Sequence, residues 1–240
     1  MKMYGDLVGW YRLMTPPEEY EQEAAIYADG LRRARREVRD VLELGCGAGH
    51  NARWMKAAFR LTLVDLSERM LALSEELNPE CRHVVGDMRS VVLGETFDAV
   101  FVHDAVAYMT SQEDLRAVMA TARKHLRPGG VVLFVPDDVR DEFEEWTDVW
   151  ENSDGERHLR FEEHNRDPDP ADELAESLYR WTMTEGGETT VVEETHTFGM
   201  FDHATWLALL AAEGFLAERV EVEGELAEEI GAIFLGVLPE

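Results

Sequence analysis

Apolar runs alternate with amphipathic stretches over residues 38–138. The runs at 41–44, 61–64, 97–102 and 131–135 have the length and composition of strands that are covered on both faces. The stretches between them place apolar residues three or four positions apart, as in helices that bury one face. Strands that alternate with helices predict an α/β fold with a doubly wound parallel sheet, in which ligands bind at the carboxyl ends of the strands.

A helical segment is expected before the first strand. Thr15 and the two prolines after it predict a helix start, and apolar residues from Tyr20 to Leu31 then recur at helical spacing. We therefore expect residues 1–37 to form an N-terminal helical unit.

The pattern changes after residue 138. Residues 139–151 are acidic, and the spacing of Phe143, Trp146 and Trp150 predicts a helix. The polar residues 152–173 predict a loop or linker.

Two later segments, 174–184 and 189–198, alternate like strands around Gly186-Gly187, a hairpin turn. Residues 139–200 are thus predicted to be an insertion with a small antiparallel β platform above the site. The core is predicted to continue at 201–240, with a helix capped by Asp202 and strands at 215–223 and 230–238.

A glycine-rich turn follows the first strand. Gly45, Gly47 and Gly49 are spaced G-x-G-x-G, a pattern that permits a tight turn and lets a ligand approach the backbone. Asp65 ends the next strand, about 20 residues on, where a Rossmann-type site holds ribose hydroxyls. With Glu43, two residues before the first glycine, this stretch resembles motif I of the class I S-adenosylmethionine-dependent methyltransferases.

Later segments extend the resemblance in the order of that family. They are 81–88, 97–102 and 126–135, so that the likeness covers roughly residues 38–138. The resemblance implies a seven-stranded Rossmann-like sheet of order 3-2-1-4-5-7-6, with S-adenosyl-L-methionine as cofactor and S-adenosyl-L-homocysteine as product. It also implies that Asp87 pairs with the adenine amino group and that an apolar neighbour covers the ring.

The cofactor site implied by these motifs extends over the core and the N-terminal segment. Residues 1–37 would form a lid in which Tyr11 and Tyr20 either close on the methionine end of the cofactor or anchor the helix to the core. The full set of predicted cofactor-binding residues is Tyr11, Tyr20, Glu43, Gly45, Cys46, Gly47, Asn51, Asp65, Leu66, Met70, Asp87, Met88 and His103.

The C-terminal part narrows the resemblance. The run from Thr195 to Phe201, Ala212–Phe215 and Gly231–Val237 look like small-molecule N-methyltransferases that act on amino sugars. The chain departs from those enzymes after the fourth strand, where it has His103-Asp104-Ala105-Val106-Ala107-Tyr108. Their acceptors are nucleotide-linked and anionic, which conflicts with the charge of this chain.

The net charge of −27 is unevenly distributed. Residues 1–136 carry 17 basic and 20 acidic side chains, whereas residues 137–240 carry 6 and 30. Such an acidic half repels phosphate backbones and disfavours a nucleic-acid acceptor. It either favours a cationic or amine-bearing small-molecule acceptor or is only a solvated surface.

The remaining composition gives expectations about surroundings. The chain has no apolar run long enough to cross a membrane, its first residues lack a signal-peptide core, and its two cysteines make no disulfide framework. We expect a cytoplasmic enzyme with no membrane partner and no metal site, and we consider a homodimer.

Catalytic candidates follow the fourth and fifth strands. His103 has a suitable pKa for a base, or it contacts the cofactor through its backbone. Asp137, with Asp138, either binds an amine or caps a following helix, and Tyr108 is the third candidate. Glu194 and His196 either face the pocket or are structural.

Methylation of an amine nitrogen is the function that we favour. O- or C-methylation of a small metabolite is the alternative within enzymes, and cofactor binding without catalysis is the alternative outside them.

Overall fold

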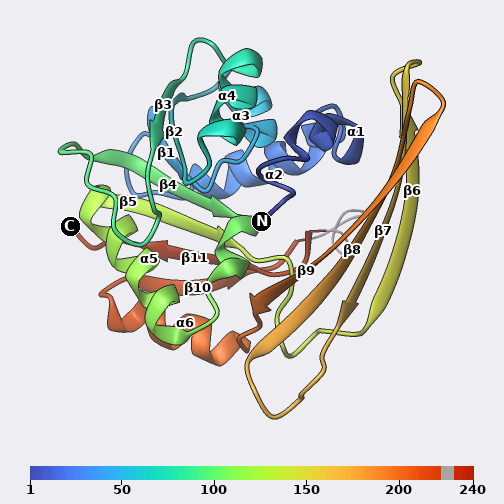
Figure 1. The fold of residues 1–240 in the computed structure, drawn as a ribbon. Coiled ribbons are helices and arrows are strands. Elements are labelled where there is room, and N and C mark those ends of the chain that lie inside the picture. Colours follow the sequence, from blue (N-terminus) through green and yellow to red (C-terminus); the bar gives the residue numbers. More distant parts are fainter. Residues whose placement is uncertain (223–229) are drawn as a thin grey trace.

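The computed structural model describes residues 1–222 and 230–240, and these form two separate sheets (Figure 1). The larger sheet has seven strands in the order β10-β11-β5-β4-β1-β2-β3. In core numbering this is 3-2-1-4-5-7-6, which confirms the predicted order. Its strands are β1 (Asp40–Leu44), β2 (Arg60–Asp65), β3 (Arg82–Val85), β4 (Phe97–His103), β5 (Leu126–Val135), β10 (Leu216–Val220) and β11 (Ile233–Val237). Five of them are parallel, and β11 pairs antiparallel with both β5 and β10. Residue 223, the end of one predicted strand, lies outside the described residues.

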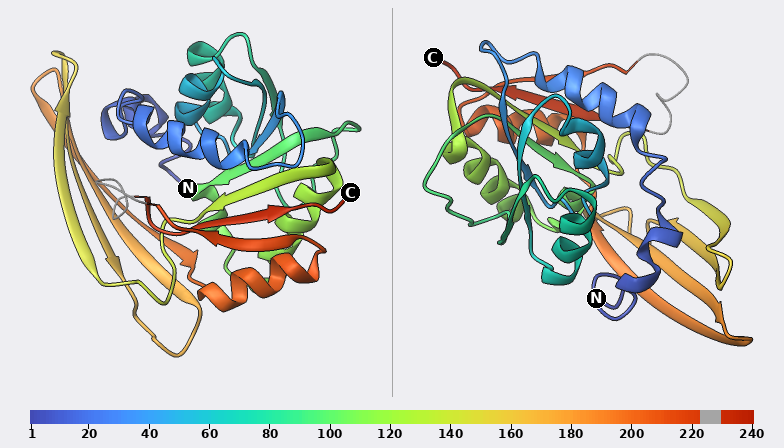
Figure 2. Two further views of the ribbon diagram at one scale, coloured as in Figure 1. Left: turned by 180° about the vertical axis from the view of Figure 1, so that it is seen from behind. Right: turned by 90° about the horizontal axis from the view of Figure 1, so that it is seen from above.

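Helices cover both faces of this sheet (Figures 1 and 2). One face carries α2 (Glu21–Leu31), α3 (His50–Met55) and α4 (Glu68–Leu77), and the other carries α5 (Gln112–His125) and α6 (His203–Ala212). The strands are buried on both sides, which explains their continuous apolar runs. The predicted cap of α6 is confirmed, because the Asp202 carboxylate accepts a hydrogen bond from Thr205 N at 2.7 Å.

The predicted antiparallel platform is also confirmed, and it is larger than expected. Its order is β6-β7-β8-β9, formed by β6 (Trp146–Ser153), β7 (Arg157–Arg166), β8 (Leu174–Glu185) and β9 (Glu188–Gly199). Gly186 and Gly187 make the turn between β8 and β9, and both have the positive φ angles that such a hairpin requires. The platform stands beside the carboxyl ends of the parallel strands (Figure 1).

The helix predicted at 139–151 is wrong. Residues 146–151 belong to β6, and the described structure has no helix over 139–145. Trp146 and Trp150 are four residues apart, a spacing that fits one face of a strand as well as one turn of a helix. Pairing with β7 decides between the two, since Trp150 lies opposite Phe161 with ring centroids 4.6 Å apart.

The loop predicted at 152–173 is wrong for residues 157–166, which form β7. In this strand Leu159, Phe161 and Asn165 are buried and alternate with charged residues. Only two of its ten residues are strongly apolar, so its pattern is weak in the sequence. Backbone pairing on both sides, with β6 and with β8, supplies what composition does not.

The N-terminal segment joins the two sheets. The short helices η1 (Val8–Trp10) and α1 (Tyr11–Met14) pack on the platform, where Trp150 Nε1 donates to Met14 O at 2.8 Å. A helix start at Thr15 is wrong, because Thr15 ends α1 and α2 begins at Glu21. Residues before proline disfavour helical backbone, and Thr15 is extended.

Within the described residues, no helix combines the length and the hydropathy that a bilayer crossing requires.

Candidate active site

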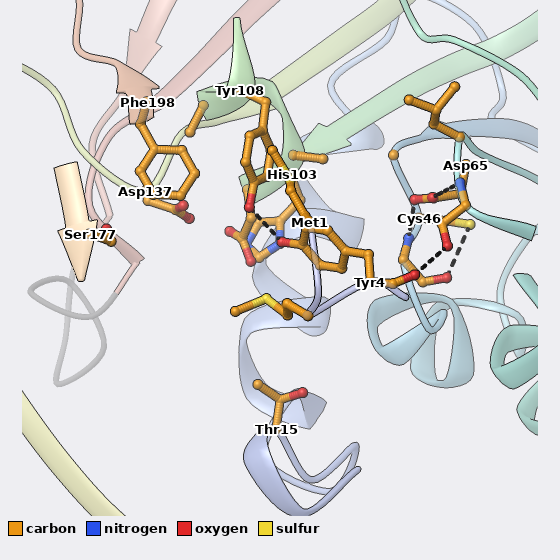
Figure 3. A pocket seen from close by; sticks show the side chains of 18 of the residues that line it. Met1, Tyr4, Thr15, Cys46, Asp65, His103, Tyr108, Asp137, Ser177 and Phe198 are labelled. Carbon is orange, nitrogen blue, oxygen red and sulfur yellow. Dashed lines mark hydrogen bonds and ion pairs between the residues drawn. The ribbon is translucent and has the colours of Figure 1, made fainter. Parts of the chain in front are cut away.

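A cavity of about 1080 Å³ lies between the main sheet and the platform. In Figure 3, Cys46 and Asp65 lie at one side, and Asp137, Phe198 and Ser177 lie at the other. Residues from the N-terminal segment, including Met1 and Tyr4, line it as well. The predicted site residues line this cavity except Met70, Glu194 and His196, and the buried side chain of Met70 lies below the glycine loop.

The glycine loop is tied to Asp65. Gly45, Gly47 and Gly49 all have positive φ angles of 52–78°, so the backbone takes a path that is strained for other residues. The amide of Gly47 donates to Asp65 Oδ2 at 2.8 Å, and the amide of Ser67 donates to Asp65 Oδ1 at 2.8 Å. Each carboxylate oxygen keeps acceptor capacity, so Asp65 can hold the loop and bind ligand hydroxyls together.

Glu43 lies beneath this loop and is 4% exposed. Burial raises its pKa to about 8. Its Oε2 atom accepts no hydrogen bond from the described residues. A buried acceptor at the cavity wall is a place for a ligand's donor group.

Asp87 and Met88 follow β3 at the same end of the cavity. Arg89 binds the Asp87 carboxylate, with Nη2 at 2.7 Å from Oδ2, and this hydrogen bond lowers the pKa of Asp87. The predicted adenine contact of Asp87 stays a prediction, as does the role of Met88.

Four carboxyl groups line the other end. Asp104 follows β4, Asp137 and Asp138 follow β5, and Glu163 comes from β7 of the platform. The first three lie at carboxyl ends of parallel strands, where α/β sheets bind ligands. The helix that Asp137 was alternatively expected to cap is absent from the described structure.

Asp104 and Asp137 form a carboxyl pair that shares a hydrogen bond, so one of the two carries a proton. Burial raises the pKa of Asp137, and the negative charge of Asp104 raises it further. Burial acts to raise the pKa of Asp104 as well, but the charge and hydrogen bond of His103 lower it on balance. The Asp104 side chain is 50% exposed and that of Asp137 is also exposed, so both face the open cavity.

His103 is held by protein groups at both ring nitrogens. Its Nε2 lies 2.9 Å from Asp104 Oδ1 and 3.0 Å from the Tyr27 hydroxyl, and its Nδ1 lies 3.4 Å from Asn51 Nδ2. Burial would lower the pKa of His103, but nearby carboxylates raise it on balance. This geometry suits a residue that orients Asp104 better than one that takes a proton from an acceptor.

Tyr108 belongs to a hydrogen-bonded chain that begins at the cavity wall with Tyr4 and Tyr108. Its hydroxyl lies 2.8 Å from the Tyr4 hydroxyl and 2.6 Å from His196 Nδ1. His196 Nε2 is 3.2 Å from Glu194, whose carboxylate accepts the Lys2 amide at 2.7 Å. Glu194 and His196 do not line the cavity, and they tie the N-terminal segment to the platform.

Sequence reasoning missed Tyr4 and Glu163. Glu163 was missed because β7 was interpreted as a loop, although Leu159, Phe161, Glu163 and Asn165 share one face by strand alternation. Tyr4 carries no local signal, because its place depends on how the N-terminal segment folds back over the core.

Residues 41–130 match a family described as a methyltransferase domain. The chain contains a methyltransferase domain. This domain includes the glycine loop, Asp65, Asp87 and the carboxyl end of β4.

Relatives of the domain act on more than one kind of atom. The chain is 35% identical over 121 residues to a dTDP-3-amino-3,4,6-trideoxy-alpha-D-glucopyranose N,N-dimethyltransferase of Streptomyces venezuelae, which covers 50% of this chain and 51% of that protein. It is 32% identical over 120 residues to a malonyl-[acyl-carrier protein] O-methyltransferase of Serratia marcescens, and this match covers 50% of this chain and 46% of that protein. The chain thus aligns with about half the length of these curated relatives.

The structural likeness extends beyond the methyltransferase domain. CalS10, an amino pentose methyltransferase from Micromonospora echinaspora whose structure has SAM bound, superimposes with a TM-score of 0.77 at 27% identity. The match covers 91% of both chains, so it includes the platform.

Proposed function

We propose that this chain transfers a methyl group from S-adenosylmethionine to an amine nitrogen of a small molecule. The observation that carries the proposal is a single cavity whose two ends suit a cofactor and an amine. At one end are the glycine loop and Asp65, and at the other is the carboxyl pair of Asp104 and Asp137. The two named methyltransferases that act on amino sugars support the choice of nitrogen.

The residues at the glycine-loop end fit the cofactor. Asp65 keeps acceptor capacity for ribose hydroxyls, Glu43 has a buried acceptor atom, and the loop presents bare backbone. We propose the predicted set without Met70 as the cofactor site, with Tyr11 and Tyr20 at its cover, since both line the cavity. When bound, the cofactor supplies an activated methyl group on sulfur.

The chain's own part in the reaction is alignment and proton handling. An amine must lose a proton before its lone pair is available, and a positioned base typically contributes about 10²–10⁴ in rate. The raised pKa of Asp137 makes it a stronger base than an ordinary carboxylate, once it is ionised beside a cationic amine. Asp104, held by His103, orients Asp137. A cationic amine that binds beside the pair favours release of the shared proton to solvent, so that Asp137 is ionised and can accept the proton that the amine loses.

The N-terminal segment helps to exclude water from the cavity. Met1, Met3 and Tyr4 line the cavity, and the Glu194 carboxylate holds the amides of Lys2 and Met3. Covering the cavity in this way would keep water from the activated methyl group. The division into lid, core and platform, a cytoplasmic location and a homodimer remain proposals.

Incubation with methyl-labelled S-adenosylmethionine and a cell extract separated by charge tests the function. We expect label in amine-containing compounds, identified by mass spectrometry. Label only among neutral compounds and acids would replace amine methylation with O- or C-methylation. Tight cofactor binding without label in any fraction would favour the non-catalytic alternative.

Substitutions of Asp137 and of His103 should lower kcat by different amounts. We expect Asp137→Asn to lower kcat about 100-fold or more, because asparagine cannot hold the amine proton. We expect His103→Ala to lower kcat less, about tenfold, because it removes an orienting contact to Asp104. Steady-state kinetics over pH 6–9, with cofactor affinity measured by calorimetry, separates the two. Equal kcat for wild type and Asp137→Asn would remove Asp137 from this role.

A further inference from the structure

We propose that the acceptor of this chain is a cationic amine whose body carries no phosphate, so that it is not a sugar linked to a nucleoside diphosphate. This inference rests on the proposed amine methylation and names its substrate class. It follows from the charges that the two sheets place around the acceptor end of the cavity.

Carboxyl groups face this end from both walls, and burial raises the pKa of Asp138 to about 6 and that of Glu163 to about 7. Asp104, Asp137 and Asp138 lie on the main-sheet side, and Glu163 lies on the platform side. Asp138 and Glu163 both act on the charge of Asp137, so all these groups share one electrostatic neighbourhood. An amine between the sheets is attracted from both sides, whereas a diphosphate meets like charges on both sides.

No arginine or lysine side chain in the described lining is free to bind a phosphate. Arg89 is the one arginine or lysine in that lining, and its guanidinium is bound to Asp87 at 2.7 Å and to Asp114 at 3.0 Å. Burial lowers the pKa of His50 to about 4, so that side chain is neutral. His103 is paired with Asp104 Oδ1 at 2.9 Å, and Met1, which carries the amino terminus, also lines the cavity. The sequence over residues 223–229 contains four glutamates and no arginine or lysine, so it cannot add a cation.

The arginines of the platform form ion pairs away from the cavity. Arg157, Arg160, Arg166 and Arg180 are ion-paired with platform carboxylates, and none of them lines the cavity. The other polar groups on the inner face of the platform are neutral. Asn165, Ser177 and Tyr179 suit hydroxyl or ether oxygens on an uncharged body.

Neighbouring residues on β7 provide a matched test of this charge. Glu163 faces the cavity, whereas Glu162 is bound to Arg160 and Arg180. Glu163→Gln and Glu162→Gln each replace one carboxyl group of the same strand with a neutral amide, and titration above pH 8 keeps Glu163 ionised in the wild type. Only the first removes it from the cavity wall.

Calorimetric titration of the protein saturated with S-adenosylhomocysteine tests the proposal without requiring turnover. The probes are methyl 3-amino-3,6-dideoxyglucopyranoside and the same amino sugar linked to dTDP. We expect the methyl glycoside to bind at least about tenfold more tightly, because the diphosphate brings its negative charge beside the carboxyl groups that are ionised. We expect Glu163→Gln to weaken glycoside binding about tenfold and Glu162→Gln to change it less than about twofold.

Each other result overturns the proposal. Equal or tighter binding of the nucleotide-linked sugar would do so, as would failure of both probes to bind. Wild-type affinity for the glycoside in a folded Glu163→Gln protein would also overturn it. If that variant does not fold, wild-type affinity in Asp138→Asn would overturn it instead. A chain that binds the glycoside but transfers no labelled methyl group would fail the proposed function alone.

Discussion

Replacing Asp65 with alanine should weaken S-adenosylmethionine binding about 100-fold or more, because hydrogen bonds to a charged acceptor each contribute about 1.5–3 kcal/mol. Two losses combine in this variant. The carboxylate that we assign to the ribose hydroxyls disappears, and the Gly47 amide loses its partner at 2.8 Å. The glycine loop therefore loses its tether together with the ligand contact.

Two further variants serve for comparison. Asp65→Asn is the conservative substitution, and Asp29→Ala is a surface control. Asparagine keeps an acceptor oxygen without the charge, so we expect a smaller loss, about tenfold. Asp29 is an exposed aspartate whose carboxylate pairs with Arg32 on the surface of α2, so Asp29→Ala should leave affinity unchanged. Calorimetry gives the affinities, and thermal melts show whether each variant is folded. Unchanged affinity for S-adenosylmethionine in a folded Asp65→Ala protein would contradict the assignment of the cofactor site.

Gly199→Ala should lower the free energy of unfolding by about 3 kcal/mol or more, near the upper end of the cost of overpacking. Gly199 ends β9, where the platform meets the core. A Cβ atom there would lie 2.0 Å from the Met109 carbonyl oxygen and 2.8 Å from Phe201 Cε2. The first neighbour is backbone and cannot turn aside, so the strand end or the segment after η2 (Asp104–Tyr108) must move.

Gly9→Ala is the control for this variant, because a Cβ at Gly9 would meet nothing within 4 Å. We expect Gly9→Ala to change stability by less than about 0.5 kcal/mol. Urea unfolding, followed by tryptophan fluorescence and by circular dichroism, measures both variants. A Gly199→Ala protein with the unfolding midpoint of the wild type would show that this junction can yield, contrary to the packing described here.

The core of the fold could be predicted because its signals are local. Strands β1, β2 and β4 are buried on both faces, so their sequences are mostly apolar. The glycines that need positive φ and the aspartate that ends β2 also follow directly in the sequence. These features place the glycine-loop end of the cavity with little help from distant contacts.

The platform was harder to predict, because its first two strands are specified by the strands that pair with them. Strand β7 carries Leu159 and Phe161 among charged residues, and it is stabilised by backbone pairing on both sides. Strand β6 shares its tryptophan spacing with a helix. Composition cannot separate these states, since strand propensity depends on what lies across the sheet.

The sequence by itself determined the α/β core, its strand order through the family resemblance, the glycine loop with Asp65, and an acidic second half. Only the tertiary structure decided which of those acids matter to the cavity. Asp104 and Asp137 share a hydrogen bond because two separate strands end side by side, and Glu163 faces them because β7 alternates toward the cavity. Such meetings depend on the packing of the two sheets, and the local sequence carries no record of that packing.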